Sequence, residues 1–261
     1  MNTLLRACGL YSLGLMLLAT GCKTAPEQKS AFEDKVLSEE ASLASLRYEV
    51  IDFTDEFART IEFAADQIES QTTDPTIRRH ALRWKMHGVP KAFLCLDHPS
   101  PVAGLLDLWT LAIQMDAYYR TGAGRDAFGE WQPVATEATT HLIQSVEDVM
   151  RRCCREDSFE VARGHLAEFA AAHPFEGDLF SSPSVTRALP ERFVPTADDV
   201  FSSISSLETE VRQLQAKTGL YMEHMPRQAR WQAERLIDEQ LWPQITNALG
   251  QVPVERQLIL E

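Results

Sequence analysis

Apolar residues recur at steps of three and four through residues 43–68, the spacing that places them on one face of an α-helix. Acidic side chains dominate the other positions of this segment. The pattern predicts one long amphipathic helix whose acidic side faces solvent or, as the alternative, docks a basic partner. The apolar face comprises Leu43, Leu46, Val50, Phe53, Phe57, Ile61, Ala64 and Ile68.

Two dipeptides mark where the next helices begin. Asp74–Pro75 and Ser100–Pro101 each combine a side chain that accepts hydrogen bonds from free amides with a proline, which needs no amide partner at the first helical position. The segment after residue 101 is apolar on almost every side, which predicts a central buried helix. The segment after residue 75 is basic, so we expect it to lie against the acidic helix, an anion-binding strip being the alternative. Its basic residues are Arg78, Arg79, Arg83 and Lys85.

Helical periodicity continues over residues 130–154 and 159–172. Prolines and glycines then interrupt residues 173–195, which predicts a long loop or a hinge. We expect residues 196–250 to form a last long helix that is kinked near Pro226. Apolar positions along this helix follow a narrow coiled-coil-like seam, a candidate surface for oligomer formation. The seam comprises Val200, Ile204, Leu207, Val211 and Leu214.

These segments together predict an all-α protein. We expect an elongated antiparallel helical bundle with long first and last helices. Residues 37–172 would form the body of the bundle, and the C-terminal helix would pack on it. No segment shows the alternation of apolar and polar residues that a half-buried strand requires.

Asp107 lies inside the predicted central helix, where an isolated carboxylate would be costly to bury. We expect Arg83 to reach it and form a buried ion pair; a catalytic acid is the alternative reading of such a carboxylate. Trp84, Trp109 and Tyr118 should lie between helices. They define a candidate pocket for a small ligand.

The first 22 residues have the order of an export signal. Arg6 precedes an apolar run over residues 7–19, and small residues then lead up to a cysteine. This order resembles the signal sequence of bacterial lipoproteins. The resemblance implies that residues 1–21 are removed, that Cys22 is acylated and that residues 22–36 tether the lipid to the body. The residues that carry it are Leu17, Leu18, Ala19, Thr20, Gly21 and Cys22.

A single transmembrane anchor is the alternative for this segment. Crossing a bilayer takes about 20 apolar residues, whereas the run over residues 7–19 has the length of a signal-peptide core. Lys23 stands after the cysteine, where Asp marks inner-membrane retention in enteric-type lipoproteins. The resemblance therefore implies a lipid anchor in the outer membrane, with the body facing the periplasm. The two or more acyl chains of such an anchor give stable attachment.

Charge and cysteine content narrow the partners. The chain has 25 Lys and Arg against 38 Asp and Glu, a net charge of −13, which argues against a polyanion such as nucleic acid as partner. In the oxidising periplasm, Cys95 could form a disulfide with Cys153 or Cys154. The alternative is three small, buried thiols at helix ends.

No pattern for metal binding, cofactor binding or catalysis stands out. The histidines form no HExxH motif and lie at no zinc-ligand spacing from a cysteine pair, and a GxSxG motif is absent. We therefore predict no metal, no cofactor and no enzymatic activity.

Residues 74–85 and 226–234 resemble segments of uncharacterised helical envelope proteins of bacteria, which implies a membrane-associated, all-helical body. The predicted function is binding or scaffolding of another envelope protein. The alternative is a sensory or regulatory domain that binds a small ligand between its helices.

Overall fold

The computed structural model describes residues 29, 31–39, 41–188, 207–241 and 243–244. Helices form the regular structure of these ranges, which contain no strand. The prediction of an all-α fold is therefore confirmed. The predicted signal peptide and Cys22 lie outside the described residues, as do Val200 and Ile204 of the predicted seam.

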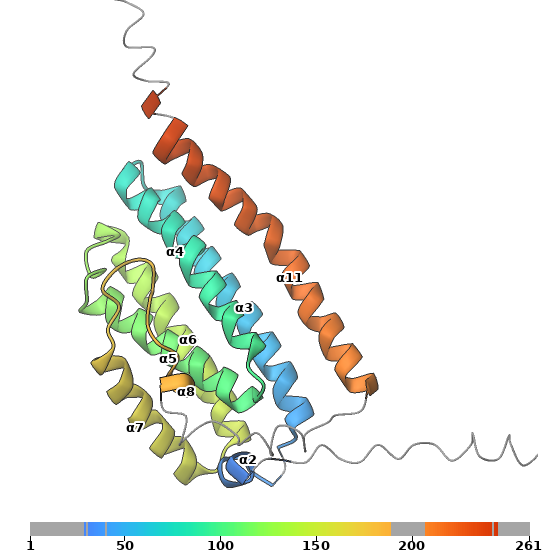
Figure 1. The fold of residues 1–261 in the computed structure, drawn as a ribbon. Helices are drawn as coiled ribbons and strands as arrows, with labels where there is room; N and C mark the ends of the chain where they lie inside the picture. Colours follow the sequence, from blue (N-terminus) through green and yellow to red (C-terminus); the bar gives the residue numbers. More distant parts are fainter. Residues whose placement is uncertain (1–28, 30, 40, 189–206, 242, 245–261) are drawn as a thin grey trace, which may run out of the picture.

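Two helix pairs form the body of the fold. Helix α3 (Leu43–Gln71) and helix α4 (Pro75–Leu94) are joined by a short turn and lie side by side, and helix α5 (Pro101–Arg120) packs against helix α6 (Gln132–Cys153) (Figure 1). Contacts of α3 with α5 and α6 join the two pairs. The shorter elements are α2 (Ala31–Val36), η1 (Cys95–Asp97), η2 (Gly129–Trp131) and α8 (Val185–Ala188).

Two further helices cover opposite sides of this body. Helix α7 (Glu156–Ala172) packs on α5, whereas the long helix α11 (Leu207–Leu236) lies along α3 and α4 and continues into a π-helical turn, η3 (Ile237–Leu241) (Figure 1). Helix α11 therefore touches the first helix pair, and α7 touches the second. None of the helices in the described ranges is long and apolar enough to cross a membrane.

Side-chain caps begin the helices where the sequence predicts them. The Asp74 carboxylate accepts a hydrogen bond of 2.7 Å from the amide of Thr76, and Pro75 follows it at the first helical position. The Ser100 hydroxyl caps α5 in the same way, accepting from the amide of Ala103 at 3.5 Å. Each cap satisfies an amide that has no partner inside its helix.

Helices α3 and α5 supply the core. All eight apolar positions that predicted the face of α3 are buried. Helix α5 is buried along almost its whole length, as its all-round apolar sequence predicts, because α3, α4, α6 and α7 pack around it. A glycine-rich turn ends α5: a Cβ atom at Gly124 would overlap the Tyr118 side chain, and Gly129 adopts a φ of 54°.

Helix α11 continues through Pro226 without a break in the helix. A proline inside a helix removes the hydrogen bond to the carbonyl four residues earlier, here that of Met222. Both residues are exposed, so water can bond this carbonyl.

Replacing Trp109 by Ala should lower the free energy of unfolding by about 3–5 kcal/mol. The Trp109 indole is fully buried and stacks on Phe159, with ring centroids 5.3 Å apart. Urea denaturation followed by circular dichroism would measure the loss. Phe63→Ala on α3 is the control: Phe63 is 73% exposed, so its removal should change stability by no more than about 0.5 kcal/mol. Equal losses in the two variants would contradict this account of the core.

Candidate binding site

The aromatic residues predicted to form a ligand pocket are core residues. Trp84 and Trp109 are fully buried, and Tyr118 is nearly so. Each packs on its own aromatic neighbours. In this structure the three side chains are packing residues, and none of them lines the pocket described below; a ligand site at these residues stays a prediction. The neighbours are Tyr119 and Phe128 for Trp84, Phe159 for Trp109, and Tyr119, Phe175 and Phe180 for Tyr118.

The predicted ion pair between Arg83 and Asp107 is wrong. The Arg83 guanidinium donates to Asp178 at 3.1 Å and to Glu239 at 3.2 Å. Both acids lie far from Arg83 in the sequence, one in the loop after α7 and the other in η3. The partners of Arg83 therefore come from distant segments that only the tertiary structure brings together. The carboxylate of Asp107 has other hydrogen-bond partners.

Asp107 caps the short helix α8. Its carboxylate accepts hydrogen bonds from the amide of Thr186 at 3.2 Å and from the hydroxyl of Ser184 at 2.7 Å. The Thr186 hydroxyl also contacts Nε2 of His98 at 2.9 Å. Asp107 fixes the loop after α7 to the core helix through these bonds.

This cluster of hydroxyls, His98 and Asp107 does not have the order of a catalytic triad. A triad needs the nucleophile on one imidazole nitrogen and the carboxylate on the other. Here the Thr186 hydroxyl and the Asp107 carboxylate both face Nε2 of His98, at 2.9 Å and 3.4 Å. Thr186 is fully buried. The contacts indicate a structural network.

The three cysteines of the body are free and buried, so the predicted disulfide between Cys95 and Cys153 or Cys154 is not formed. Cys95 follows the end of α4, whereas the other two end α6, where a backbone bridge joins Cys154 to Leu37. Burial raises the pKa of Cys154 to about 12, with a contribution from Cys153. Burial, followed by the charge of Asp107, also raises the pKa of Cys95. These thiols are protonated at neutral pH and are therefore poor nucleophiles.

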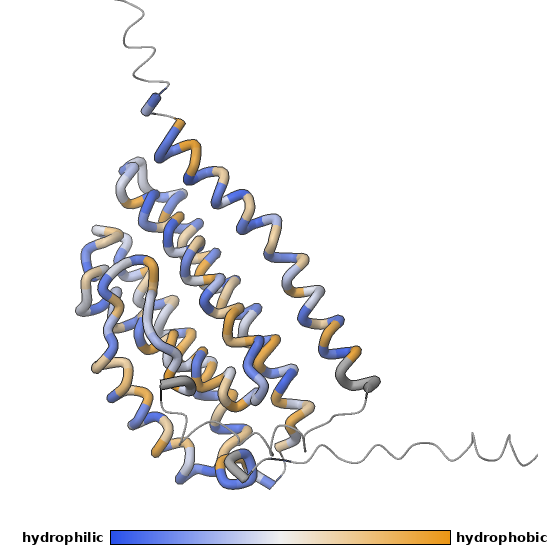
Figure 2. Tube along the Cα trace, in the orientation of Figure 1, coloured by the Kyte–Doolittle hydropathy of each residue, from blue (hydrophilic) through white to orange (hydrophobic). Residues whose placement is uncertain are grey.

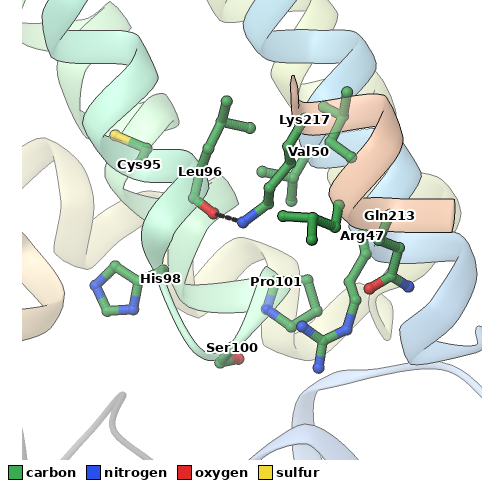
Figure 3. Close-up of a pocket in the computed structure, with 11 residues that line it drawn as sticks. Arg47, Val50, Cys95, Leu96, His98, Ser100, Pro101, Gln213 and Lys217 are labelled. Carbon is green, nitrogen blue, oxygen red and sulfur yellow. Dashed lines mark hydrogen bonds between the residues drawn. The ribbon is translucent and has the colours of Figure 1, made fainter. Parts of the chain in front are cut away.

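A pocket with both polar and apolar walls occurs elsewhere, where α11 meets the corner between η1 and α5. It encloses about 190 Å³. Figure 3 shows Arg47 of α3 beside it, with Gln213 and Lys217 entering from α11. The Lys217 amine donates to the carbonyl of Leu96. The pocket also includes apolar surface from Val50, Ile51, Leu96, Pro101 and Leu214.

The polar groups of this pocket are mainly donors. Gln213 is only 7% exposed, and its amide nitrogen has no hydrogen-bond partner among the residues that the structure describes. Burial lowers the pKa of Lys217 more than the carboxylate of Asp97 raises it, and the positive charge of Arg47 lowers it further. A buried carboxylate, that of Glu33, lies next to the pocket and accepts from the Ser100 hydroxyl at 2.8 Å.

An arrangement of this kind can hold a small anion. Two cationic side chains and a buried amide donor complement the oxygens of a carboxylate or a phosphate. The pocket is smaller than the 300–1,000 Å³ typical of sites for drug-sized ligands, which restricts it to a small ion. Among the described residues, no group of three or more His, Cys, Asp or Glu side chains could hold a metal ion.

The sequence contains a signal for this pocket that a search for apolar stripes misses. The residues that α11 turns toward α3 and α4 recur at steps of three and four, but most of them are polar, so they form no apolar stripe. Only the contact with α3 and α4 shows that they share one face. These residues are Gln213, Lys217, Leu220, His224, Arg227 and Trp231.

The chain was compared with known proteins. No protein-family model matches it, and searches of curated proteins and of solved structures found no significant match.

Proposed function

We propose that this protein is a non-enzymatic binding or scaffolding module of the bacterial cell envelope, held at the outer membrane by acyl chains on Cys22, with its helical body in the periplasm. The order of charged, apolar and small residues before Cys22 supports the anchor, through its resemblance to lipoprotein signals. Two or three acyl chains hold a protein to a bilayer stably, whereas a single chain does so only marginally.

The observation that carries the binding role is a second apolar face on α11. Its inner face packs on α3 and α4, but exposed large apolar side chains also share a second face, at steps of three, eight, three and eleven residues. Leu214 is 65% exposed and Met222 is 69% exposed. Figure 2 shows apolar positions along this outermost helix. The outer face of α11 comprises Val211, Leu214, Met222, Met225 and Leu236, of which Leu214 also borders the pocket described above.

The chemistry of this outer face favours a protein partner. A patch of exposed apolar side chains is typical of an interaction site. Methionine side chains are flexible and adapt to the shape of a partner. Polar residues beside the stripe include the uncharged Gln215, Gln228 and Gln232. Binding would therefore depend on apolar burial, and added salt should weaken it little. The fitting partner is an apolar helix or groove of another envelope protein.

A photo-crosslinking residue at Met222, in the full-length protein in intact cells, should yield one discrete protein adduct. The same residue at Val161 of α7 is the matched control, since Val161 is also an apolar side chain and is 60% exposed. The double substitution Leu214→Glu and Met225→Glu should reduce the Met222 adduct at least several-fold, because burying a carboxylate opposes binding. Equal adducts from positions 222 and 161 would refute the outer face as the binding surface. An adduct of twice the chain mass would identify the partner as a second copy.

Metabolic labelling with radioactive palmitate should mark the wild-type protein and fail to mark Cys22→Ser. The variant should also leave the membrane fraction, because the acyl chains supply the attachment. Cys154→Ser serves as the control for losing a cysteine, since that thiol is buried and should accept no lipid. A Cys22→Ser protein that remains in the membrane pellet would contradict the proposed anchor.

A second function is favoured by the pocket beside Arg47, Gln213 and Lys217. Its donors complement a small anion, so the body could act as a sensory or regulatory domain whose ligand lies between α11 and the first helix pair. In this case the ligand would bridge α3 and α11 and stabilise their contact.

Inorganic phosphate should raise the melting temperature of the full-length protein if the pocket takes small anions. Saturation to 100 times the dissociation constant contributes about 2.7 kcal/mol, and each kcal/mol shifts the melting temperature of a chain of this size by about 2–4 °C. Lys217→Met should abolish the shift, whereas the control Lys35→Met on α2 should retain it. Equal shifts in both variants, or no shift in the wild type, would exclude an anion site at Lys217.

A further inference from the structure

The contact between α11 and α3 contains a closed cycle of charged side chains. Each member contacts the next through a hydrogen bond of 2.8 to 3.0 Å, and acidic and basic residues alternate around the cycle. Three members belong to α3 and three to α11. In order, this charge cycle comprises Asp55, Arg59, Glu223, Arg227, Glu62 and His224, which returns to Asp55.

His224 is the member of the cycle whose charge can change near neutral pH. Its Nδ1 lies 3.0 Å from a carboxylate oxygen of Glu62, and its Nε2 lies 3.0 Å from a carboxylate oxygen of Asp55. An ionised carboxylate only accepts hydrogen bonds, and a neutral imidazole has a single N–H. Both contacts are satisfied together only when the imidazole carries two protons and a positive charge.

No water can replace either hydrogen bond of His224, because the side chain is buried among its neighbours. Its side chain is fully buried, and α4 covers it with the uncharged ring of Phe93, at 5.1 Å between centroids. Burial by itself lowers the pKa of His224, but the hydrogen bonds to Glu62 and Asp55 outweigh it and raise the pKa above its ordinary value. Arg227, the nearest positive group on α11, opposes this rise.

We propose that the charge cycle is a pH-sensitive latch, which holds α11 against α3 while His224 is protonated and releases α11 when His224 loses its proton. Deprotonation leaves three carboxylates facing two guanidinium groups. It also turns a lone pair of one imidazole nitrogen toward a carboxylate at hydrogen-bond distance. No other group in the cycle can donate the proton that His224 has lost, because the arginines do not give up theirs and the ionised carboxylates carry none.

The direction of the pH dependence follows from the two states of α11. Docking raises the pKa of His224 above that of a free imidazole, about 6.5. The stabilisation is therefore complete below about pH 6.5 and is lost as the pH rises through the docked pKa.

An acidic limit comes from Asp55. Burial raises the pKa of Asp55, but its hydrogen bonds to His224 and Arg59 lower it below the ordinary value. The contribution of Asp55 is complete above about pH 3.9 and is lost as the pH falls through this lowered pKa. The latch is therefore closed in mildly acidic solution and opens as the pH rises through the pKa of docked His224.

Opening the latch would change two surfaces of the protein. The inner face of α11 contains the buried side chains of Leu220 and Trp231, which would reach solvent. Gln213 and Lys217 would leave the anion pocket, which exists only while α11 is docked. The latch is independent of the proposed envelope function, since it rests on contacts within the chain.

Hydrogen–deuterium exchange of the full-length protein in detergent micelles tests the latch. After correction for the intrinsic exchange rate, amides of α11 should lose protection between about pH 6 and pH 9. The protection factor of these amides should fall by about tenfold for each unit by which docking raises the pKa of His224. The amides of α5 should keep their protection. Unchanged protection of α11 over this range would overturn the proposal.

Two variants separate the latch from a general effect of pH. His224→Gln should remove the pH dependence of α11 exchange, whereas the matched control His165→Gln, on the partly exposed histidine of α7, should retain it. A pH dependence that persists in His224→Gln would overturn the proposal.

Glu62→Gln keeps the test decisive if His224→Gln does not fold. A neutral amide at position 62 accommodates either form of the imidazole, so His224 should titrate at lower pH than in the wild type. Nuclear magnetic resonance of the imidazole C–H protons measures this titration directly. A wild-type His224 that titrates at or below about pH 6.5, or one that Glu62→Gln leaves unchanged, would overturn the latch.

Discussion

The burial of α5 is the constraint on which the rest of the structure depends. A helix that is apolar on almost every side must be covered on every side, and α3, α6 and α7 do so in the described structure. The same burial makes Asp107 an obligatory acceptor, so the loop after α7 folds back to supply Ser184 and Thr186. The aromatic residues along α5 are consequently packing residues.

Helix α11 is held to the rest of the protein largely by charged side chains, unlike α5, which is held by apolar burial. It lies outside the two helix pairs, and its contact with α3 and α4 combines a few apolar side chains with many charged ones. Lys85 of α4, for example, lies under Trp231 of α11, with its ammonium 6.0 Å from the ring centroid, and donates to Asp66 and Glu69 of α3. Charged contacts respond to pH, whereas the burial of α5 does not. The parts of the molecule that we associate with binding and regulation therefore coincide with a helix whose contact contains many charged side chains.

Particular residues show how far sequence reasoning reaches. The spacing of Leu43 through Ile68 predicted the buried face of α3, and Asp74 and Ser100 predicted the starts of α4 and α5, because these signals are local. The partner of Arg83 was predicted wrongly, and Trp84, Trp109 and Tyr118 are packing residues. In these cases helix periodicity defines which residues share a face, but not which residues of distant segments meet that face.

The sequence by itself determined the helical class, the core helix, the caps and the acidic character of the chain, since each depends on residues within a few turns of one another. Only the tertiary structure decided that Gln213, Lys217 and His224 of α11 meet Arg47, Asp55 and Glu62 of α3. His224 and Glu62, for example, are 162 residues apart in the sequence. Charged side chains are compatible with solvent as well as with one another, so their pattern does not reveal their partners until the helices are packed.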